Sequence, residues 1–340
     1  MINLKDLTYD ELENFIKSLG EPAFRVKQVY KWLYTGVESF EEMTNIPKSL
    51  ISKFEGEATV SAPSIRAKYV SKDGTVKYVF ELSDGELIES VVMEYKHGRS
   101  ICISTQAGCN MGCKFCASTV GGKRRDLTAG EIIDQVIFAQ KDLGIRISNI
   151  VMMGIGEPLD NYDNVIKFLK NVGHKDGLNI GYRHISLSTC GLADKIIRLA
   201  EEKMPVTLSL SLHAPTDELR ESIMPINKKY KIAKVLDACR SYIEKTGRRV
   251  SFEYTLIHGV NDSLAHADKL SDLVRGMNCH VNLIPVNEAR ENMVRSRKND
   301  VEKFMERLIK RGINATVRRQ LGNDIKASCG QLVAKESEKR

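Results

Sequence analysis

The segment from Cys109 to Cys116 holds the residues of this 340-residue chain whose types and spacing most directly indicate chemistry. Its three cysteines, Cys109, Cys113 and Cys116, are separated by three and then by two residues. Thiolates are the usual ligands of iron–sulfur clusters. Because three cysteines leave one metal atom of such a cluster without a protein ligand, the segment predicts an open coordination position where a substrate binds.

A structural zinc site is the alternative for the same three cysteines. Zinc in structural sites usually has four protein ligands, and no fourth Cys or His follows at zinc-finger spacing in the sequence. The spacing therefore favours an iron–sulfur cluster, and zinc stays the less favoured alternative.

From about residue 100 the hydrophobic pattern alternates between short strands and longer helices, which is typical of a parallel α/β sheet. The expected strands are residues 100–105, 148–154, 183–189, 205–213, 250–257 and 280–287, with helices such as 129–143, 192–202 and 232–245 between them. The pattern predicts a barrel-like arrangement, in which chemistry takes place on the loops after the carboxyl ends of the strands.

Polar, small or sulfur-bearing residues follow these strands. They are the loop that begins at Cys109, the segment Gly154–Glu157, Ser188, the segment Ser211–His213, and Asn287. Because the carboxyl ends of parallel strands meet at one edge, we expect these residues to share one site.

Three regions surround or precede this core. Residues 1–57 show helical spacing of apolar residues and predict a small helical domain. Residues 58–97 contain the pairs Asp73-Gly74 and Asp84-Gly85, which are hairpin signals and predict a β-meander. The core is expected over residues 98–333, and residues 334–340 form a basic tail.

The composition is that of a globular protein, with 42% hydrophobic and 28% charged residues. No apolar run reaches the roughly 18–20 residues of a membrane span, and the acidic start is unlike a secretory signal. We therefore expect a cytoplasmic protein without membrane contact, whose cysteines stay reduced.

The formal charge of +7 is concentrated near the C-terminus. Residues 289–340 contain 14 Lys and Arg against 7 Asp and Glu, whereas the rest of the chain carries equal numbers of both. This excess indicates either a solvated helix face with a frayed end or a surface that contacts nucleic-acid phosphates.

The cysteine triplet, with Phe115 before its last cysteine, resembles the signature of the radical S-adenosylmethionine (SAM) superfamily. The resemblance implies a partial (β/α)6-type barrel with a [4Fe–4S] cluster held by Cys109, Cys113 and Cys116, and SAM bound at the fourth iron. It further implies SAM contacts from Gly156, Glu157, Ser188, Ser211, Leu212, His213 and Asn287. A strand-end serine without a ligand is the alternative for Ser188 and Ser211.

Ordered segments narrow the resemblance to bacterial RNA adenine-C2 methyltransferases of large-subunit ribosomal RNA and transfer RNA. These segments are CISTQAGCNMGCKFC, MMGIGEPLDN, SLHAP, MPIN, HGVNDS, HVNLIPVN and GNDIKASCGQL. The ribosomal-RNA adenine-C8 methyltransferases that confer antibiotic resistance share nearly all of them and are the alternative. The GEP segment and the ASTVGG run after Cys116 favour C2.

Adenine C2 is an electron-poor carbon without a lone pair, so a carbon radical suits it better than direct displacement on SAM. The resemblance implies that Cys329 takes a methyl group from one SAM. A 5′-deoxyadenosyl radical from a second SAM then removes hydrogen from that methyl group, and the methylene radical adds to the base. Cys102 finally attacks Cys329 and releases the product, leaving a disulfide. Glu89 is expected as a proton acceptor, with an exposed, purely structural carboxylate as its alternative.

The resemblance also implies partners. These are ribosomal RNA, an adenosine beside the anticodon of transfer RNAs, and a reducing electron donor such as flavodoxin, with the protein acting as a monomer. The target base should be unpaired or flipped out, and Arg25, Lys27 and Lys31 of the helical domain are expected to help hold RNA. A non-catalytic RNA-binding protein with a structural metal is the alternative from another functional class.

Overall fold

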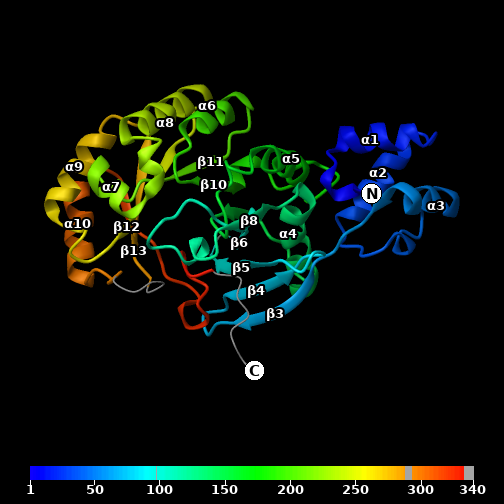
Figure 1. Ribbon diagram of the computed structural model, residues 1–340, viewed down its shortest axis with the longest axis horizontal. Helices are drawn as coiled ribbons and strands as arrows, with labels where there is room; N and C mark the ends of the chain where they lie inside the picture. The colour runs from blue at the N-terminus through cyan, green and yellow to red at the C-terminus, as the bar shows by residue number, and fades with distance from the viewer. Residues whose placement is uncertain (97, 288–292, 333–340) are drawn as a thin grey trace.

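One sheet of ten strands organises the chain, and helices pack along it (Figure 1). The structure is a computed structural model that describes residues 1–96, 98–287 and 293–332. The strand order is β14-β13-β12-β11-β10-β9-β6-β5-β4-β3. The basic tail predicted at residues 334–340 lies outside the described residues.

Seven neighbouring strands of this sheet run parallel and form the predicted partial barrel. They are β6 (Gly98–Cys102), β9 (Asn149–Met152), β10 (Ile185–Thr189), β11 (Thr207–Ser211), β12 (Val250–Leu256), β13 (Cys279–Pro285) and β14 (Ala315–Val317). The helices that follow them are α4 (Ala129–Leu143), α5 (Tyr162–Gly173), α6 (Ala193–Glu201), α7 (Asp217–Ile223), α8 (Ile232–Thr246), α9 (Leu264–Val274) and α10 (Lys298–Lys310). All six predicted strands are confirmed, and the short edge strand β14 was not expected.

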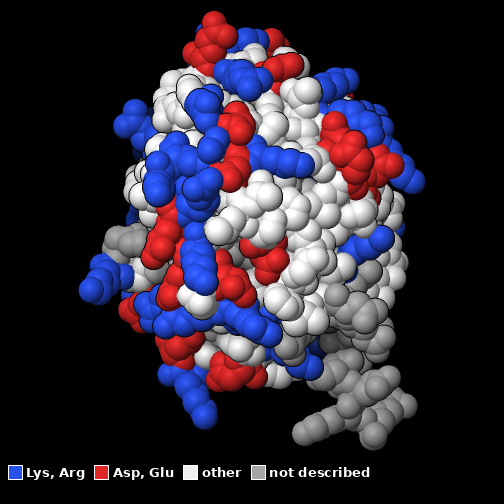
Figure 2. Space-filling view, turned by 90° about the vertical axis from the view of Figure 1, so that its left-hand side faces the viewer, with Lys and Arg blue, Asp and Glu red and all other residues white. Residues whose placement is uncertain are grey.

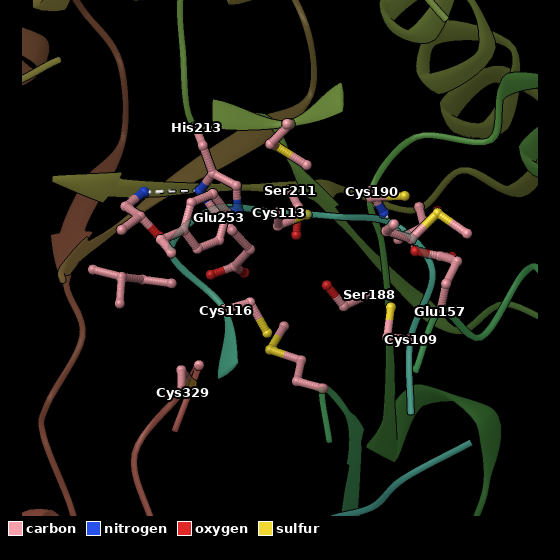
Figure 3. Close-up of a pocket in the computed structure, with 18 of the residues that line it drawn as sticks. Cys109, Cys113, Cys116, Glu157, Ser188, Cys190, Ser211, His213, Glu253 and Cys329 are labelled. Carbon is pink, nitrogen blue, oxygen red and sulfur yellow. Dashed lines mark hydrogen bonds between the residues drawn. The ribbon is translucent and has the colours of Figure 1, made fainter. Parts of the chain in front are cut away.

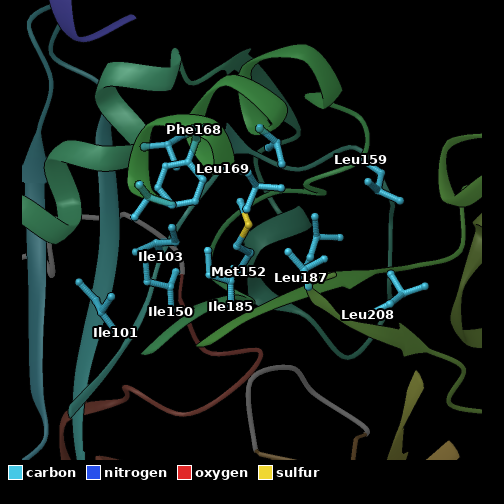
Figure 4. Packing of buried hydrophobic residues seen from close by; sticks show 14 of the residues in the cluster. Ile101, Ile103, Ile150, Met152, Leu159, Phe168, Leu169, Ile185, Leu187 and Leu208 are labelled. Atoms are coloured by element: carbon cyan, nitrogen blue, oxygen red, sulfur yellow. The ribbon is translucent and has the colours of Figure 1, made fainter. Parts of the chain in front are cut away.

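Alternation along the strands separates a packed outer face from a polar inner face. In β10 the buried Ile185 and Leu187 point toward the helices, while Ser188 points inward, because successive side chains of a strand face opposite sides. Figure 4 shows Ile185 and Leu187 beside Phe168 and other apolar side chains in this outer layer. The sequence pattern therefore places small polar groups inside the barrel.

An antiparallel extension continues the sheet beyond β6 and confirms the predicted meander. It consists of β5 (Leu87–Tyr95), β4 (Val76–Glu81) and β3 (Ser64–Val70). The two turns between them contain Gly74 and Gly85, both at positive φ, a conformation that glycine adopts at little cost. In Figure 1 the C-terminal segment, drawn in red, runs alongside this extension.

The N-terminal region is helical, as predicted, and packs against the barrel. It contains α1 (Tyr9–Ser18), α2 (Phe24–Leu33) and α3 (Lys48–Glu57), and a two-stranded ladder of β1 (Ile2–Asn3) with β2 (Ala58–Thr59) closes it. Lys5 forms a fully buried ion pair with Asp134 of α4 (Nζ–Oδ1 2.5 Å), and Tyr9 stacks on His174 (ring centroids 4.3 Å). The division into domains at residues 57 and 97 stays a prediction.

A small hairpin that the sequence did not indicate lies between the first strand and the first barrel helix. It is formed by β7 (Gln106–Gly108) and β8 (Lys123–Asp126), and the cysteine loop connects the two strands. The first strand therefore ends at Cys102 rather than at residue 105 as predicted. Within the described residues, no helix is both long and apolar enough to cross a membrane.

Candidate functional site

A cavity of about 910 Å³ opens at the carboxyl ends of the barrel strands (Figure 3). We call it the strand-end cavity. Most of the residues predicted from the sequence line it together: Cys109, Cys113, Cys116, Gly156, Glu157, Ser188, Ser211, His213, Asn287 and Cys329. The cysteine loop, the ends of β10 and β11, the segments after β9 and β13, and the C-terminal segment thus converge on one site.

The cysteine loop owes its shape to tight backbone contacts. Gly108 has φ +81°, and a Cβ atom there would lie 1.9 Å from the carbonyl oxygen of Gly122, so only glycine fits this close approach. The side-chain oxygen of Asn110 accepts a hydrogen bond from the backbone of Lys123 (2.7 Å). The β7–β8 hairpin therefore fixes both ends of the loop.

The three cysteines of the loop are free thiols that face one cavity. Burial raises the pKa of Cys109 to about 12 and also raises the pKa of Cys113. Within the described residues, no three His, Cys, Asp or Glu side chains are arranged to hold a single metal ion. An iron–sulfur cluster binds each thiolate through a different iron, so three thiols that line one cavity are a suitable ligand set for such a cluster.

Glu157 braces the loops after β9 and β10. One carboxylate oxygen accepts from the backbone N–H of Leu159 (3.1 Å) and the other from that of Cys190 (2.8 Å). Gly156 before it has φ +108°, and a Cβ atom there would lie 2.6 Å from the Gln106 side chain. Glu157 therefore shapes the cavity through backbone contacts, while its buried side chain forms part of the lining.

The end of β11 contributes residues with different placements. Ser211 and His213 line the cavity, whereas the side chain of Leu212 is fully buried in the hydrophobic core. The His213 ring accepts a hydrogen bond from the backbone of Thr255 (2.9 Å) and packs edge-on against Phe115 (centroids 4.7 Å). Burial lowers the pKa of His213 to about 3, so the ring is neutral at physiological pH. Because its side chain is buried in the core, Leu212 can contact a ligand in the cavity only through its backbone.

A buried arginine that the sequence reading missed lies beneath this part of the cavity. Arg220 of α7 is 0% exposed, and its guanidinium donates to the carbonyl oxygens of Cys190, Ser211 and Leu212. It also donates to Asn227 (3.0 Å). These hydrogen bonds fix the ends of two barrel strands relative to α7, and α7 itself meets the cysteine loop where Lys114 donates to Ile223.

A second cavity, which we call the Cys102 cavity, lies between the barrel and the antiparallel extension and has a volume of about 740 Å³. Cys102, the last residue of β6, lines it together with Val91 and Met93 of β5. Burial raises the pKa of Cys102 to about 12, and the neighbouring Cys329 contributes to the rise.

Cys329 belongs to the wall between the two cavities. Five residues line both of them, and these are Met153, Ile284, Asn287, Arg318 and Cys329. In Figure 3, Cys329 approaches the strand-end cavity from the C-terminal segment. One sulfur is therefore adjacent both to the three-cysteine loop and to the cavity that contains Cys102.

Hydrogen bonds hold the loop that carries Cys329 from both sides. Asn287 donates from its amide to the Cys329 carbonyl (2.9 Å), and Ala117 donates from its backbone to Gly330 (2.8 Å). On the other side, the Gly322 N–H donates to Asp73 in the β3–β4 turn (2.9 Å). Any movement of Cys329 must therefore break defined contacts with the barrel and the meander.

Two further site residues, Glu253 and Arg318, were not singled out from the sequence. Glu253 of β12 lines the strand-end cavity and pairs with Arg318 (Oε2–Nη2 3.5 Å). A carboxylate within the otherwise apolar segment of β12 is the signal that could have identified it, because buried charges need partners. Arg318 had been counted only as part of the C-terminal basic excess.

Glu89 lies on β5, outside the lining of both cavities. It is only 2% exposed and pairs with Lys77 (Oε1–Nζ 3.5 Å). The alternative of an exposed strand carboxylate is therefore wrong. Its side chain falls on the same face of β5 as Val91 and Met93, which line the Cys102 cavity.

Comparisons with known proteins agree with this architecture. Residues 103–271 match the radical SAM superfamily, and residues 2–60 match the ribosomal RNA large subunit methyltransferase N-terminal domain. A partial α/β barrel with an open three-cysteine loop at its strand ends defines the radical SAM class of enzymes.

The relatives of this chain narrow the class. It is 55% identical to the probable dual-specificity RNA methyltransferase RlmN of Clostridium novyi over 98% of both chains, and 52% identical to that of a Thermoanaerobacter species over 100% of both. A crystal structure of a radical SAM methyltransferase from Sphaerobacter thermophilus superposes with a TM-score of 0.94 at 42% identity, covering 98% of this chain and 100% of the other. The chain belongs to the RlmN family of dual-specificity, radical SAM RNA methyltransferases.

Proposed function

We propose that this enzyme methylates C2 of one adenosine in large-subunit ribosomal RNA and of an adenosine beside the anticodon of transfer RNAs. Its relatives are named dual-specificity RNA methyltransferases. The observation that carries the proposal is the position of Cys329 in the wall shared by the strand-end cavity and the Cys102 cavity. A methyl carrier needs access to SAM on one side and to a resolving thiol on the other.

The first step uses Cys329 as a nucleophile. Its thiolate attacks the methyl carbon of SAM, an S–CH₃ bond forms on Cys329, and S-adenosylhomocysteine leaves. When bound, a [4Fe–4S] cluster supplies the electron that cleaves a second SAM and yields the 5′-deoxyadenosyl radical. Two SAM molecules are therefore consumed in each turnover.

The later steps take place on the protein sulfurs. The methyl group of Cys329 loses a hydrogen atom, and the resulting methylene carbon adds to adenine C2. The adduct gives up its C2 proton to a base and one electron to an acceptor, a role that the cluster oxidised in the cleavage of SAM would supply. Cys102 then attacks the Cys329 sulfur, the S–S bond forms as the S–CH₂ bond breaks, and the released carbon takes up a proton to complete the methyl group.

The residues around the strand-end cavity suit this chemistry. Ser188 and Ser211 offer hydroxyl groups to SAM from the inner faces of β10 and β11. The neutral His213 adds no cation that would repel the SAM sulfonium. We propose backbone contacts to SAM from Gly156, Glu157 and Leu212, and a side-chain contact from Asn287.

Glu89 is proposed as the acceptor of the C2 proton. It precedes Val91 by two residues on the face of β5 that lines the Cys102 cavity, so it adjoins the position expected for the base. Glu89→Gln should then accumulate an RNA adduct that still holds the C2 hydrogen. An adduct that resolves at the normal rate would remove Glu89 from the mechanism.

The RNA-binding surface is proposed near the Cys102 cavity rather than on α10. Figure 2 shows the face that carries α9 and α10, where Lys and Arg alternate with Asp and Glu. There Arg307 binds Asp268 (2.7 Å) and Arg311 binds Asp272 (2.6 Å), as in a solvated helix face. The exposed Arg319 lines the Cys102 cavity. It is also nearer to Cys329 in the sequence than Arg307 and Arg311 are.

The helical N-terminal region is proposed to hold folded RNA through Arg25, Lys27 and Lys31. Lys31 is exposed, whereas Lys27 pairs with Asp176 (3.4 Å) and Arg25 donates to Gln28 (2.8 Å). Lys31→Ala should therefore weaken RNA binding more than Lys27→Ala. We further propose a cytoplasmic monomer reduced by a donor such as flavodoxin.

The experiment that tests the function is nucleoside mass spectrometry of ribosomal and transfer RNA from cells with and without the gene. Loss of 2-methyladenosine from both RNAs on deletion supports the proposal. Loss of 8-methyladenosine instead would support the adenine-C8 alternative. Unchanged RNA, with a colourless protein that binds zinc, would support the non-catalytic alternative.

A further inference from the structure

Arg318 lies at the junction of the two cavities and has no role in the steps above. Its Nη1 atom donates to the Cys329 sulfur at 3.0 Å, and its two terminal nitrogens lie 3.5 and 3.4 Å from the sulfur of Met153. The side chain is 26% exposed, so solvent screens these contacts only in part. Two sulfurs and one carboxylate thus share a single guanidinium.

Residues of β12 and β13 fix the position of the Arg318 guanidinium. Glu253, whose side chain is 4% exposed, pairs with Arg318 at 3.5 Å. The Glu253 carboxylate in turn accepts from the Asn282 amide (2.7 Å) and from the Ser251 hydroxyl (3.1 Å). Because β12 and β13 hold Glu253 rigidly, the position of the Arg318 guanidinium is defined relative to the strand-end cavity.

The chemical state of the Cys329 sulfur determines how strongly Arg318 holds it. A thiolate carries a full negative charge and accepts a charge-assisted hydrogen bond from a guanidinium. A thioether is neutral and only a weak acceptor. Methylation of Cys329 therefore removes most of the attraction, while the Arg318–Glu253 pair is left unchanged.

We propose that Arg318 is a positioning residue that holds the thiolate of Cys329 toward SAM and releases the sulfur once it is methylated. The proposal rests on the proposed role of Cys329 as methyl acceptor. It explains how one sulfur in a hydrogen-bonded loop serves two cavities in succession. The released thioether turns toward the base, while Glu253 retains the guanidinium.

Thiol alkylation of the full-length, cluster-loaded protein tests whether Arg318 stabilises the thiolate of Cys329. The rate at which iodoacetamide modifies Cys329 is measured by peptide mass spectrometry, counting only the unmethylated peptide. Arg318→Gln and Arg318→Met should lower this rate at least about tenfold, because they remove the charge-assisted hydrogen bond that stabilises the thiolate. Arg318→Lys should keep most of the wild-type alkylation rate, because the positive charge is retained. Arg319→Gln is the matched control, since it removes the adjacent charge without touching the Cys329 sulfur.

The sign of the change separates this role from a merely structural one. A variant whose loop had simply loosened would expose Cys329 and raise the alkylation rate. An unchanged or raised rate in Arg318→Gln, or an equal fall in Arg319→Gln, would overturn the proposal. If Cys329 is never found methylated in active protein, the proposed function fails, yet the alkylation rates still report on Arg318.

The release of methylated Cys329 from Arg318 is measured by hydrogen–deuterium exchange of residues 327–332. Methylated wild-type protein should exchange faster there than unmethylated protein, and unmethylated Arg318→Gln should match the methylated form. Equal exchange in the methylated and unmethylated wild-type proteins would contradict release.

Discussion

The amide of Asn287 donates a hydrogen bond to the backbone carbonyl of Cys329 (2.9 Å), and thereby ties the end of the barrel to the C-terminal loop. The same amide accepts from Gln320 through its oxygen (2.8 Å). Asn287 lines both the strand-end cavity and the Cys102 cavity. Cys329 is therefore held at the boundary of the two cavities through its backbone, in addition to the contact of its sulfur with Arg318.

Cys329→Ala should abolish RNA methylation while iron content and SAM binding stay at the wild-type level, because the three cluster cysteines belong to another loop. Iron and sulfide analysis, equilibrium dialysis with SAM and nucleoside mass spectrometry measure the three quantities. Cys279→Ala is the matched control, since Cys279 is half-buried on β13 and lines neither cavity. Methylation retained by Cys329→Ala would refute the carrier role.

Cys102→Ala should accumulate protein covalently joined to RNA, because the adduct on Cys329 then lacks the thiol that resolves it. Denaturing gel electrophoresis after incubation with RNA detects the slower-migrating adduct, and ribonuclease digestion confirms its nature. Free protein with normal amounts of methylated RNA would show that another group resolves the adduct.

Resolution of the adduct in the wild-type enzyme should accelerate with pH. Burial raises the pKa of Cys102 to about 12, so at neutral pH the residue is a thiol and only a small fraction is the attacking thiolate. This fraction grows about tenfold for each pH unit below the pKa. Rapid-quench measurement of adduct decay between pH 7 and 9 should give such a slope, and a flat profile would contradict attack by Cys102 as the slow step.

Arg220→Met should destabilise the fold by about 3 kcal/mol, because it leaves several buried carbonyl oxygens without a donor. Chemical denaturation measures the free energy of unfolding. Arg240→Met is the control: Arg240 is exposed on α8 and, among the described residues, its side chain bonds Asp237, so its loss should change stability by less than about 1 kcal/mol. Equal losses in both variants would show that the Arg220 contacts contribute little.

Gly108→Ala should impair cluster loading, because the added Cβ atom collides with the backbone of Gly122 and distorts the cysteine hairpin. The visible absorbance of the anaerobically reconstituted protein measures loading, with an expected loss of more than half. Gly247→Ala shares a positive φ but meets no atom within 4 Å. If the two variants load alike, backbone strain rather than the collision limits loading.

The local sequence determined the elements of this fold. Strands such as ISLST in β10 read directly as one apolar face and one small polar face, because strand side chains alternate. The spacing of Cys109, Cys113 and Cys116 indicated a cluster for an equally local reason, since a short loop must bring its thiols to one cavity. The edge strand β14 and the β7–β8 hairpin escaped because three or four residues carry little periodic signal.

The tertiary structure alone decided what surrounds the sulfurs of Cys102 and Cys329. Glu253 and Arg318 pair across strands that are distant in sequence, and Arg318 reaches Cys329 only because β14 joins the parallel sheet. No periodicity encodes such contacts, since they depend on the register of the strands and the path of the C-terminal loop. The spacing in the sequence indicated Cys109, Cys113 and Cys116, the resemblance to a known family implied Cys102 and Cys329, and the packing of the sheet set Cys329 between the two cavities.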